Sequence, residues 1–204
     1  MSDMAKRYIG DWHYDHANIL HYDNRPFTSV YEMNDALVVN WNHVTAPGDT
    51  VYIVGDMFWG GPAQALPVLK ELNGQKILIR GNHDHFLNSE TKKCFDGIYE
   101  LHKVKDGDRH VVLCHFPMSS FENMFQGWYH LYAHVHTSFE ANIAENNRRL
   151  MEDLYMRPCN AINVGAMMPY IGYAPRTLDE IIEGYEYCKN SKFLIPTKEG
   201  KHHG

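Results

Sequence analysis

The chain has 204 residues, of which 44% are hydrophobic and 22% charged, and its formal net charge is −6 with histidine neutral. This length suits one globular domain, and no apolar run reaches the ~18 residues of a membrane-spanning helix. The sequence has no block of Lys and Arg, so strong binding to a nucleic-acid backbone is not expected. Because the N-terminus has no signal-peptide pattern and the four cysteines are scattered, we expect a cytoplasmic protein with reduced thiols.

Hydrophobic periodicity and turn residues predict strands and helices that alternate along the chain. Strands are expected at 6–10, 50–54, 76–79, 97–104, 109–114, 128–133 and 161–164. Helices are expected at 29–44, 62–73 and 138–155 and from residue 177 onward, the first and last of them opened by capping-box patterns. The strands at 97–104 and 109–114 are expected to pair with each other. This alternation favours an α/β layered domain over residues 1–196, with 197–204 as a C-terminal tail.

Five of the predicted strands run directly into residues that can bind a metal ion. These residues are Asp11 and His13, then Asp56, then Asn82-His83-Asp84, then His115, and finally His134 and His136. In an open α/β sheet, the loops after the carboxyl ends of the strands form the ligand crevice. If these strands are neighbours, we expect the five groups to converge on one rim.

The residue types fit a pair of metal ions. Carboxylates and neutral imidazoles suit Mn, Fe, Zn or Ni, and the absence of a cysteine cluster argues against a structural zinc site. These are too many ligand candidates for one ion, and about seven ligands suit two ions that share a carboxylate. Two ions ~3.5–4 Å apart can activate a water and hold phosphate oxygens during in-line displacement. Each motif alone also fits a capping pair, a common turn or a half-buried strand, so it is the combination that favours a metal site.

The motif order Asp-x-His, Gly-Asp, Gly-Asn-His-Asp/Glu, His and Gly-His-x-His over residues 11–136 resembles the calcineurin-like metallophosphoesterase superfamily. The segments 11–19, 24–27, 163–165 and 178–181 are similar to its small bacterial and phage-type members. This resemblance implies a four-layer α/β/β/α sandwich with two mixed β-sheets and a dinuclear metal site at the carboxyl ends of the strands.

The resemblance also implies a role for each motif residue. Seven would bind two metal ions: Asp11, His13 and His136 the first, Asn82, His115 and His134 the second, with Asp56 bridging both. His83 would contact the phosphate and protonate the leaving oxygen, and Asp84 would orient it. A hydroxide bridging the two ions would attack phosphorus.

Two departures from the family pattern bear on the substrate. Ala133 stands where glycine is usual, which leaves both following ligands intact. Met57-Phe58-Trp59-Gly60 follows Asp56, unlike the Val-Asp-Arg-Gly of protein Ser/Thr phosphatases and diadenosine-polyphosphate hydrolases. This difference argues against a phosphoprotein or dinucleotide-polyphosphate substrate. The chain is also too short for the DNA-capping domain of the repair nucleases in the superfamily.

Residues around the motifs are candidates for substrate contacts. His16 could touch the substrate or support the ligands, while Arg25 and Arg80 could clamp a phosphate or form plain salt bridges within turns. Flanking aromatic residues could stack a nucleobase or pack in the core. The connections 118–126 and 137–158 are the long ones nearest the last ligands, and we expect them to shape substrate specificity or a subunit contact.

The leading hypothesis is a metal-dependent phosphoesterase that hydrolyses a small phosphodiester, ahead of a phosphomonoester, with manganese as the favoured ion. A diester comes first because no protein nucleophile is needed and the small members commonly prefer diesters. A nucleotide substrate and a homo-oligomer both remain open. The alternatives are a non-catalytic scaffold of the same fold, which would usually have lost some ligands, and a nuclease on short single strands, which the acidic charge opposes.

Overall fold

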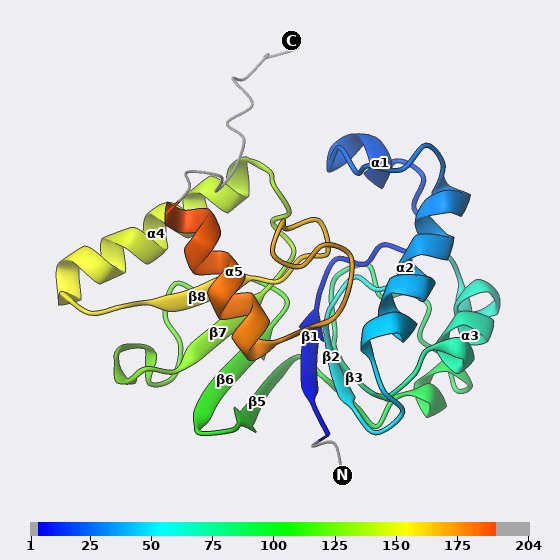
Figure 1. The fold of residues 1–204 in the computed structure, drawn as a ribbon, viewed down its shortest axis with the longest axis horizontal. Coiled ribbons are helices and arrows are strands. Elements are labelled where there is room, and N and C mark those ends of the chain that lie inside the picture. Colours follow the sequence, from blue (N-terminus) through cyan, green and yellow to red (C-terminus); the bar gives the residue numbers. More distant parts are fainter. Residues whose placement is uncertain (1–3, 191–204) are drawn as a thin grey trace.

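The computed structural model describes residues 4–190, which form two β-sheets flanked by helices (Figure 1). The strands are β1 (Lys6–Ile9), β2 (Thr50–Val54), β3 (Gln75–Ile79), β4 (Gly97–Tyr99), β5 (Leu101–Asp106), β6 (Arg109–Cys114), β7 (Tyr129–Tyr132), β8 (Asn160–Asn163) and β9 (Arg176–Thr177). The α-helices are α1 (Ile19–Tyr22), α2 (Val30–Val44), α3 (Pro62–Glu71), α4 (Phe139–Tyr155) and α5 (Leu178–Asn190), and short 3-10 turns lie at Thr91–Cys94 and Met124–Gln126. Among these residues, no helix has the length and apolar character to cross a bilayer.

Both sheets are mixed, as predicted. The five-stranded sheet has the order β4-β3-β2-β1-β9, in which β1 to β4 are parallel and β9 is antiparallel. The four-stranded sheet has the order β5-β6-β7-β8, in which only β5 is antiparallel to its neighbour. Helices α2 and α3 cover the five-stranded sheet on one side of the molecule, and α4 and α5 lie on the side of the four-stranded sheet (Figure 1). The predicted α/β/β/α sandwich is confirmed.

Parallel pairing of the central strands places their carboxyl ends at one edge. Strands β1, β2 and β3 are almost fully buried at their last two residues, as expected for parallel strands covered on both faces. The two sheets are tied together where β1 ends. There the Gly10 N–H donates to Val164 O at 2.8 Å, and the Ala166 N–H donates to Gly10 O at 2.8 Å. The strand ends of both sheets therefore meet in one place.

The predicted helices are present, and their caps explain where they begin. The Ser29 hydroxyl accepts the Glu32 N–H at 3.1 Å, and Thr177 and Glu180 cap α5 reciprocally. Helix α2 buries the predicted apolar face against the core. Helix α3 buries Ala65, Val68 and Leu69, whereas Leu66 is only half-buried.

One predicted strand is wrong in its extent. The segment 97–104 is two strands: β4 pairs in parallel with β3 in one sheet, and β5 forms the predicted hairpin with β6 in the other. The chain changes sheet at Glu100, a position that the local pattern does not mark. The short elements α1 and β9 were not predicted, because few apolar residues define them. The predicted domain boundary at 196 and the tail 197–204 lie outside the described residues.

Candidate metal centre

The structure brings all seven predicted metal ligands to the edge where the two sheets meet. Asp11 and His13 follow β1, Asp56 follows β2, Asn82 follows β3, His115 follows β6, and His134 and His136 follow β7. Four of these residues therefore come from the five-stranded sheet and three from the four-stranded sheet. Convergence at the carboxyl ends of parallel strands is what the sequence pattern predicted.

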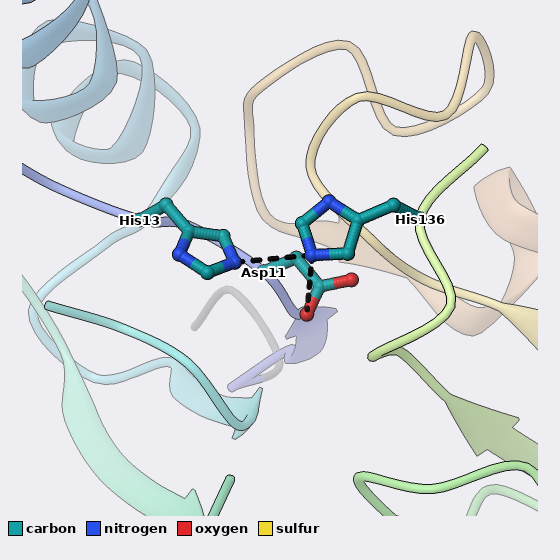
Figure 2. A group of neighbouring side chains, drawn as sticks. All are labelled: Asp11, His13 and His136. Carbon is teal, nitrogen blue, oxygen red and sulfur yellow. Dashed lines mark hydrogen bonds and ion pairs between the residues drawn. The ribbon is translucent and has the colours of Figure 1, made fainter. Parts of the chain in front are cut away.

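The first ligand group consists of Asp11, His13 and His136, whose ligand atoms all lie within 4.8 Å of one another (Figure 2). The Nε2 atoms of His13 and His136 lie 3.1 Å apart, and His136 Nε2 lies 3.8 Å from Asp11 Oδ1. Asp11 Oδ2 is buried and has no hydrogen-bond partner among the described residues. A bound cation would satisfy the Asp11 carboxylate and the two facing nitrogens together.

The second ligand group consists of Asp56, His115 and His134, whose ligand atoms also lie within 4.8 Å of one another. His115 Nε2 lies 3.4 Å from Asp56 Oδ2 and 3.1 Å from Asn82 Oδ1, so Asn82 belongs to this group. Asp56 Oδ2 also lies 3.9 Å from His13 Nε2 in the first group. Asp56 thus faces both groups, which is the position that a ligand shared by two ions requires.

Two imidazoles are oriented by hydrogen bonds on the side away from the ligand groups. His115 Nδ1 donates to Val54 O at 2.9 Å, and His136 Nδ1 donates to the Asp23 carboxylate at 2.8 Å. Because a carbonyl oxygen only accepts, His115 Nδ1 carries a proton, and Nε2, which faces two oxygen atoms, is the ring nitrogen left for a metal ion. His115 Nε2, Asp56 Oδ2 and Asn82 Oδ1 are potential ligand atoms that face one another, as a cation site requires. Hydrogen bonds that orient the ring through its other nitrogen are typical of metal-ligating histidines.

The charges within the centre shift several pKa values. Burial lowers the pKa of His115, but the carboxylates of Asp56 and Asp11 outweigh burial and raise it to about 9. Burial raises the pKa of Asp11, and burial with the neighbouring His136 holds that of His13 well below its usual range. The carboxylates that attract a proton to this cluster would attract a metal ion in its place.

Five of the seven ligands have a left-handed backbone conformation. Their φ angles lie between 47° and 68°, at Asp11, His13, Asp56, His134 and His136. Non-glycine residues rarely adopt this conformation, which costs of order 1–3 kcal/mol each, and it clusters at functional sites. Close packing adds a second constraint, because a Cβ atom on Gly81 would fall onto the Asp56 carboxylate. The fold therefore stabilises an unfavourable backbone in order to direct these side chains inward.

The sequence model of the calcineurin-like phosphoesterase family matches residues 8–157, which contain both ligand groups. The chain belongs to this family. It is 36% identical over 190 residues to an uncharacterised protein of Methanocaldococcus jannaschii, MJ1445, covering 91% of this chain and 94% of that protein. The gene 66 protein of Mycobacterium phage L5 is 29% identical over 129 residues, 54% of this chain and 62% of the phage protein.

A solved structure supports the fold independently of the ligand motifs. AQ665 of Aquifex aeolicus, a protein of unknown function, superposes with a TM-score of 0.65 at 24% identity, covering 89% of this chain and 99% of that chain. This likeness shows that the sandwich extends over nearly the whole phosphoesterase chain. It carries no information on the substrate.

The predicted catalytic pair of this phosphoesterase lies beside the ligand groups. The His83 N–H donates to Asp56 Oδ1 at 2.8 Å, and the His83 ring centroid is 6.1 Å from that of His13. The Asp84 carboxylate accepts the backbone N–H groups of Asp56, Met57 and Gly81 at 2.8–3.1 Å. Asp84 was expected to orient His83, but these bonds direct its carboxylate to the loops that carry Asp56 and Asn82.

The three predicted substrate contacts have different surroundings. His16 is buried at the centre, and its ring stacks on Trp59 with centroids 3.7 Å apart. The Arg25 side chain has no exposed surface and donates to the backbone oxygens of Asp11 and Trp12 at 2.8 and 2.9 Å. The prediction that Arg25 clamps the substrate is therefore wrong. Arg25 instead forms the alternative, a buried salt bridge within the turn, with Asp23.

Arg80, the third predicted contact, is half exposed. Its guanidinium lies 3.7 Å from a carboxylate oxygen of Glu100, at the point where the chain changes sheet. It belongs to a separate hollow that His85, Lys92 and Tyr99 also line, and none of the seven predicted ligands lines this hollow. Of its two predicted roles, Arg80 thus forms a salt bridge in the structure, and a contact with the substrate stays a prediction.

Sequence reasoning missed two acidic residues at the centre. The Asp23 side chain is buried, and its carboxylate accepts from His136 Nδ1 and from Arg25 Nε and Nη2, the last two both at 3.1 Å. Glu140, in the first turn of α4, has a carboxylate oxygen 3.9 Å from His134 Nε2. The only sequence signal for Asp23 is its place two residues before Arg25. Glu140 has no signal beyond an acidic residue at a helix N-terminus.

Proposed function

We propose that this phosphoesterase hydrolyses a small phosphodiester at the two ligand groups. The observation that carries the proposal is the pair of Asp/His groups, each drawn from both sheets, with Asp56 facing both. Two bound ions would supply an activated water and positive charge for the phosphate oxygens. Membership of the calcineurin-like phosphoesterase family supports the reaction class.

The ligand assignment follows the distances. We assign Asp11, His13 and His136 to one ion, Asn82, His115 and His134 to the other, and Asp56 to both. The mixed carboxylate, amide and imidazole donors suit manganese, and iron, zinc and nickel are also compatible with them. Metal availability would then decide among these ions.

His83 is the proposed proton donor to the leaving oxygen. Its backbone N–H is fixed on Asp56, and its partly exposed ring packs 4.8 Å from Trp59. An imidazole at this position can reach a phosphate ester held at the ligand groups while it exchanges protons with solvent. Asp84 acts as a positioning residue, because its hydrogen bonds fix the loops on both sides of His83.

One carboxylate beside the ligand groups favours a diester over a monoester. Glu140 adds a carboxylate at the mouth of the centre, 3.9 Å from His134, and is more than half exposed. A phosphodiester carries one negative charge, whereas a monoester at neutral pH carries nearly two and is repelled more strongly. The net charge of −6 also disfavours binding of long nucleic acids, because it repels their phosphates.

The proposal is tested on protein stripped of metal, with Mn²⁺ added back and bis(p-nitrophenyl) phosphate compared with p-nitrophenyl phosphate. We expect Mn²⁺-dependent turnover that is faster for the diester and at least 100-fold lower in Asp56→Asn. Asp35→Asn, an exposed carboxylate on α2, is the matched control and keeps wild-type rates. Stoichiometric Mn²⁺ binding without turnover would refute the proposal and favour a scaffold, and strongly salt-dependent DNA binding would favour a nuclease.

The cytoplasmic location, the nucleotide character of the substrate and homo-oligomer formation stay predictions. Exposed apolar side chains along α4, such as Leu150 and Leu154, are compatible with a subunit contact. No strong nucleic-acid binding is expected, because of the same acidic charge that favours a small substrate.

A further inference from the structure

A cavity of about 420 Å³ adjoins the second ligand group. His134 forms part of its wall, together with the start of α4, the segment after His115 and residues of β7 and β8. The exposed Phe116 ring lies 4.5 Å from the His134 ring, at the border between cavity and centre. The volume falls in the range of pockets that hold small organic ligands.

The described residues that line this cavity are mainly apolar and include no unpaired cationic side chain. Apolar side chains dominate it, among them Phe116, Met118, Ile143, Ala144 and Ala161. The cationic Arg148 in the wall is buried and paired with Glu145 at 2.8 Å and Glu152 at 2.6 Å. A second phosphate or a carboxylate would therefore lose its hydration in this cavity without gaining a cationic partner.

Hydrogen bonds fix both sides of the cavity. Buried His130 donates from Nδ1 to Val112 O at 3.1 Å, and its Nε2 accepts the Met118 N–H at 3.1 Å. On the other side, the Ser138 hydroxyl donates to Val135 O at 2.8 Å and accepts the Glu140 N–H at 3.1 Å, which sets the start of α4. The cavity is thus a formed site rather than a gap beside a loose loop.

We propose that this cavity receives an uncharged, apolar ring carried by the phosphodiester on the ester oxygen that is not cleaved. The inference rests on the proposed function and names the substrate class: a diester with one aryl-sized apolar substituent. Continuity through His134 would allow a phosphate at the ligand groups and a ring in the cavity to belong to one molecule. The connections after His115 and His136 would then set specificity, as the sequence predicted.

Two chromogenic diesters test this inference: phenyl p-nitrophenyl phosphate and methyl p-nitrophenyl phosphate. Both are monoanions with the same leaving group, and each rate is divided by its uncatalysed rate. We expect the Mn²⁺-loaded protein to prefer the phenyl ester at least tenfold in kcat/KM, mainly through KM. Ile143→Asn, at a half-exposed position in the lining, reduces this preference about tenfold, whereas Leu154→Asn, exposed on the same helix outside the lining, keeps it.

Equal normalised kcat/KM for the two esters, or an unchanged preference in Ile143→Asn, would overturn the inference. Absence of turnover for both esters would overturn the proposed function instead. A binding measurement would then test separately whether the cavity holds the ring. In calorimetric titrations of the Mn²⁺-loaded protein, tighter binding of diphenyl phosphate than of dimethyl phosphate, weakened by Ile143→Asn, supports the cavity as the ring site. Equal affinity for diphenyl phosphate and dimethyl phosphate overturns the assignment of the cavity as the ring site.

Discussion

The most informative perturbation of the centre changes a residue that supports a ligand without being one. Asp23 is buried beside His136 and Arg25, and its carboxylate accepts from both. Asp23→Asn keeps the shape of the side chain and removes its charge. His136 then faces an amide, with one acceptor oxygen in place of two, where a carboxylate had fixed its tautomer, and a fully buried guanidinium loses its counter-ion.

The size of both effects follows from these contacts. Loss of the partner that orients a metal-ligating histidine reduces metal affinity by about 10–100-fold. Breaking a buried ion pair costs about 3–5 kcal/mol. Arg25 keeps its two bonds to the backbone oxygens of Asp11 and Trp12, so we expect the lower end, about 3 kcal/mol.

Mn²⁺ titration calorimetry and urea unfolding of the metal-stripped protein measure the two effects separately. Asp179→Asn is the matched control, because that carboxylate is exposed and pairs with Arg109 at the surface at 2.6 Å. Its unfolding free energy should change by less than about 1 kcal/mol. Wild-type Mn²⁺ affinity and stability in Asp23→Asn would refute the reasoning that a buried carboxylate supports this centre.

Two further predictions concern acid stability and backbone space. Burial raises the pKa of Asp49, but the Arg7 guanidinium and backbone N–H groups outweigh burial and lower it. This stabilisation is therefore present above pH ~4 and lost as pH falls through the lowered pKa, so Asp49→Asn should cost about 1–3 kcal/mol at pH 7 and flatten the acid limb of urea unfolding. Gly81→Ala should displace the Asp56 carboxylate and weaken Mn²⁺ binding at least tenfold by calorimetry, whereas Gly61→Ala, in open surroundings, should not. Unchanged profiles in Asp49→Asn or Gly81→Ala would contradict these two arguments.

The sequence predicted the centre well because its signal is local. Each ligand follows a short apolar strand, and parallel neighbours place their carboxyl ends together, so Asp11, Asp56 and His115 converge without further information. Helix α2 was predicted for the same reason, since one buried face and a serine cap define it.

What the sequence did not predict depends on contacts between distant segments. Strand β4 joins the five-stranded sheet only because β3 is available as a parallel neighbour, which local alternation cannot indicate. Asp23 meets His136 across 113 positions of the chain, and Glu140 meets His134 only through the path of α4. Arg25 looked like a phosphate clamp because burial of an arginine is decided by the packing around it.

The origin of the ligands has a mechanical consequence. Each ligand group combines residues after strands of the five-stranded sheet with residues after strands of the four-stranded sheet. An ion bound in either group would cross-link the two layers, so the layers could separate only after the ion had left. Slow ion release would then limit the rate at which the sandwich opens, and the amides where the layers touch, such as that of Gly10, would exchange hydrogen at the rate of metal dissociation.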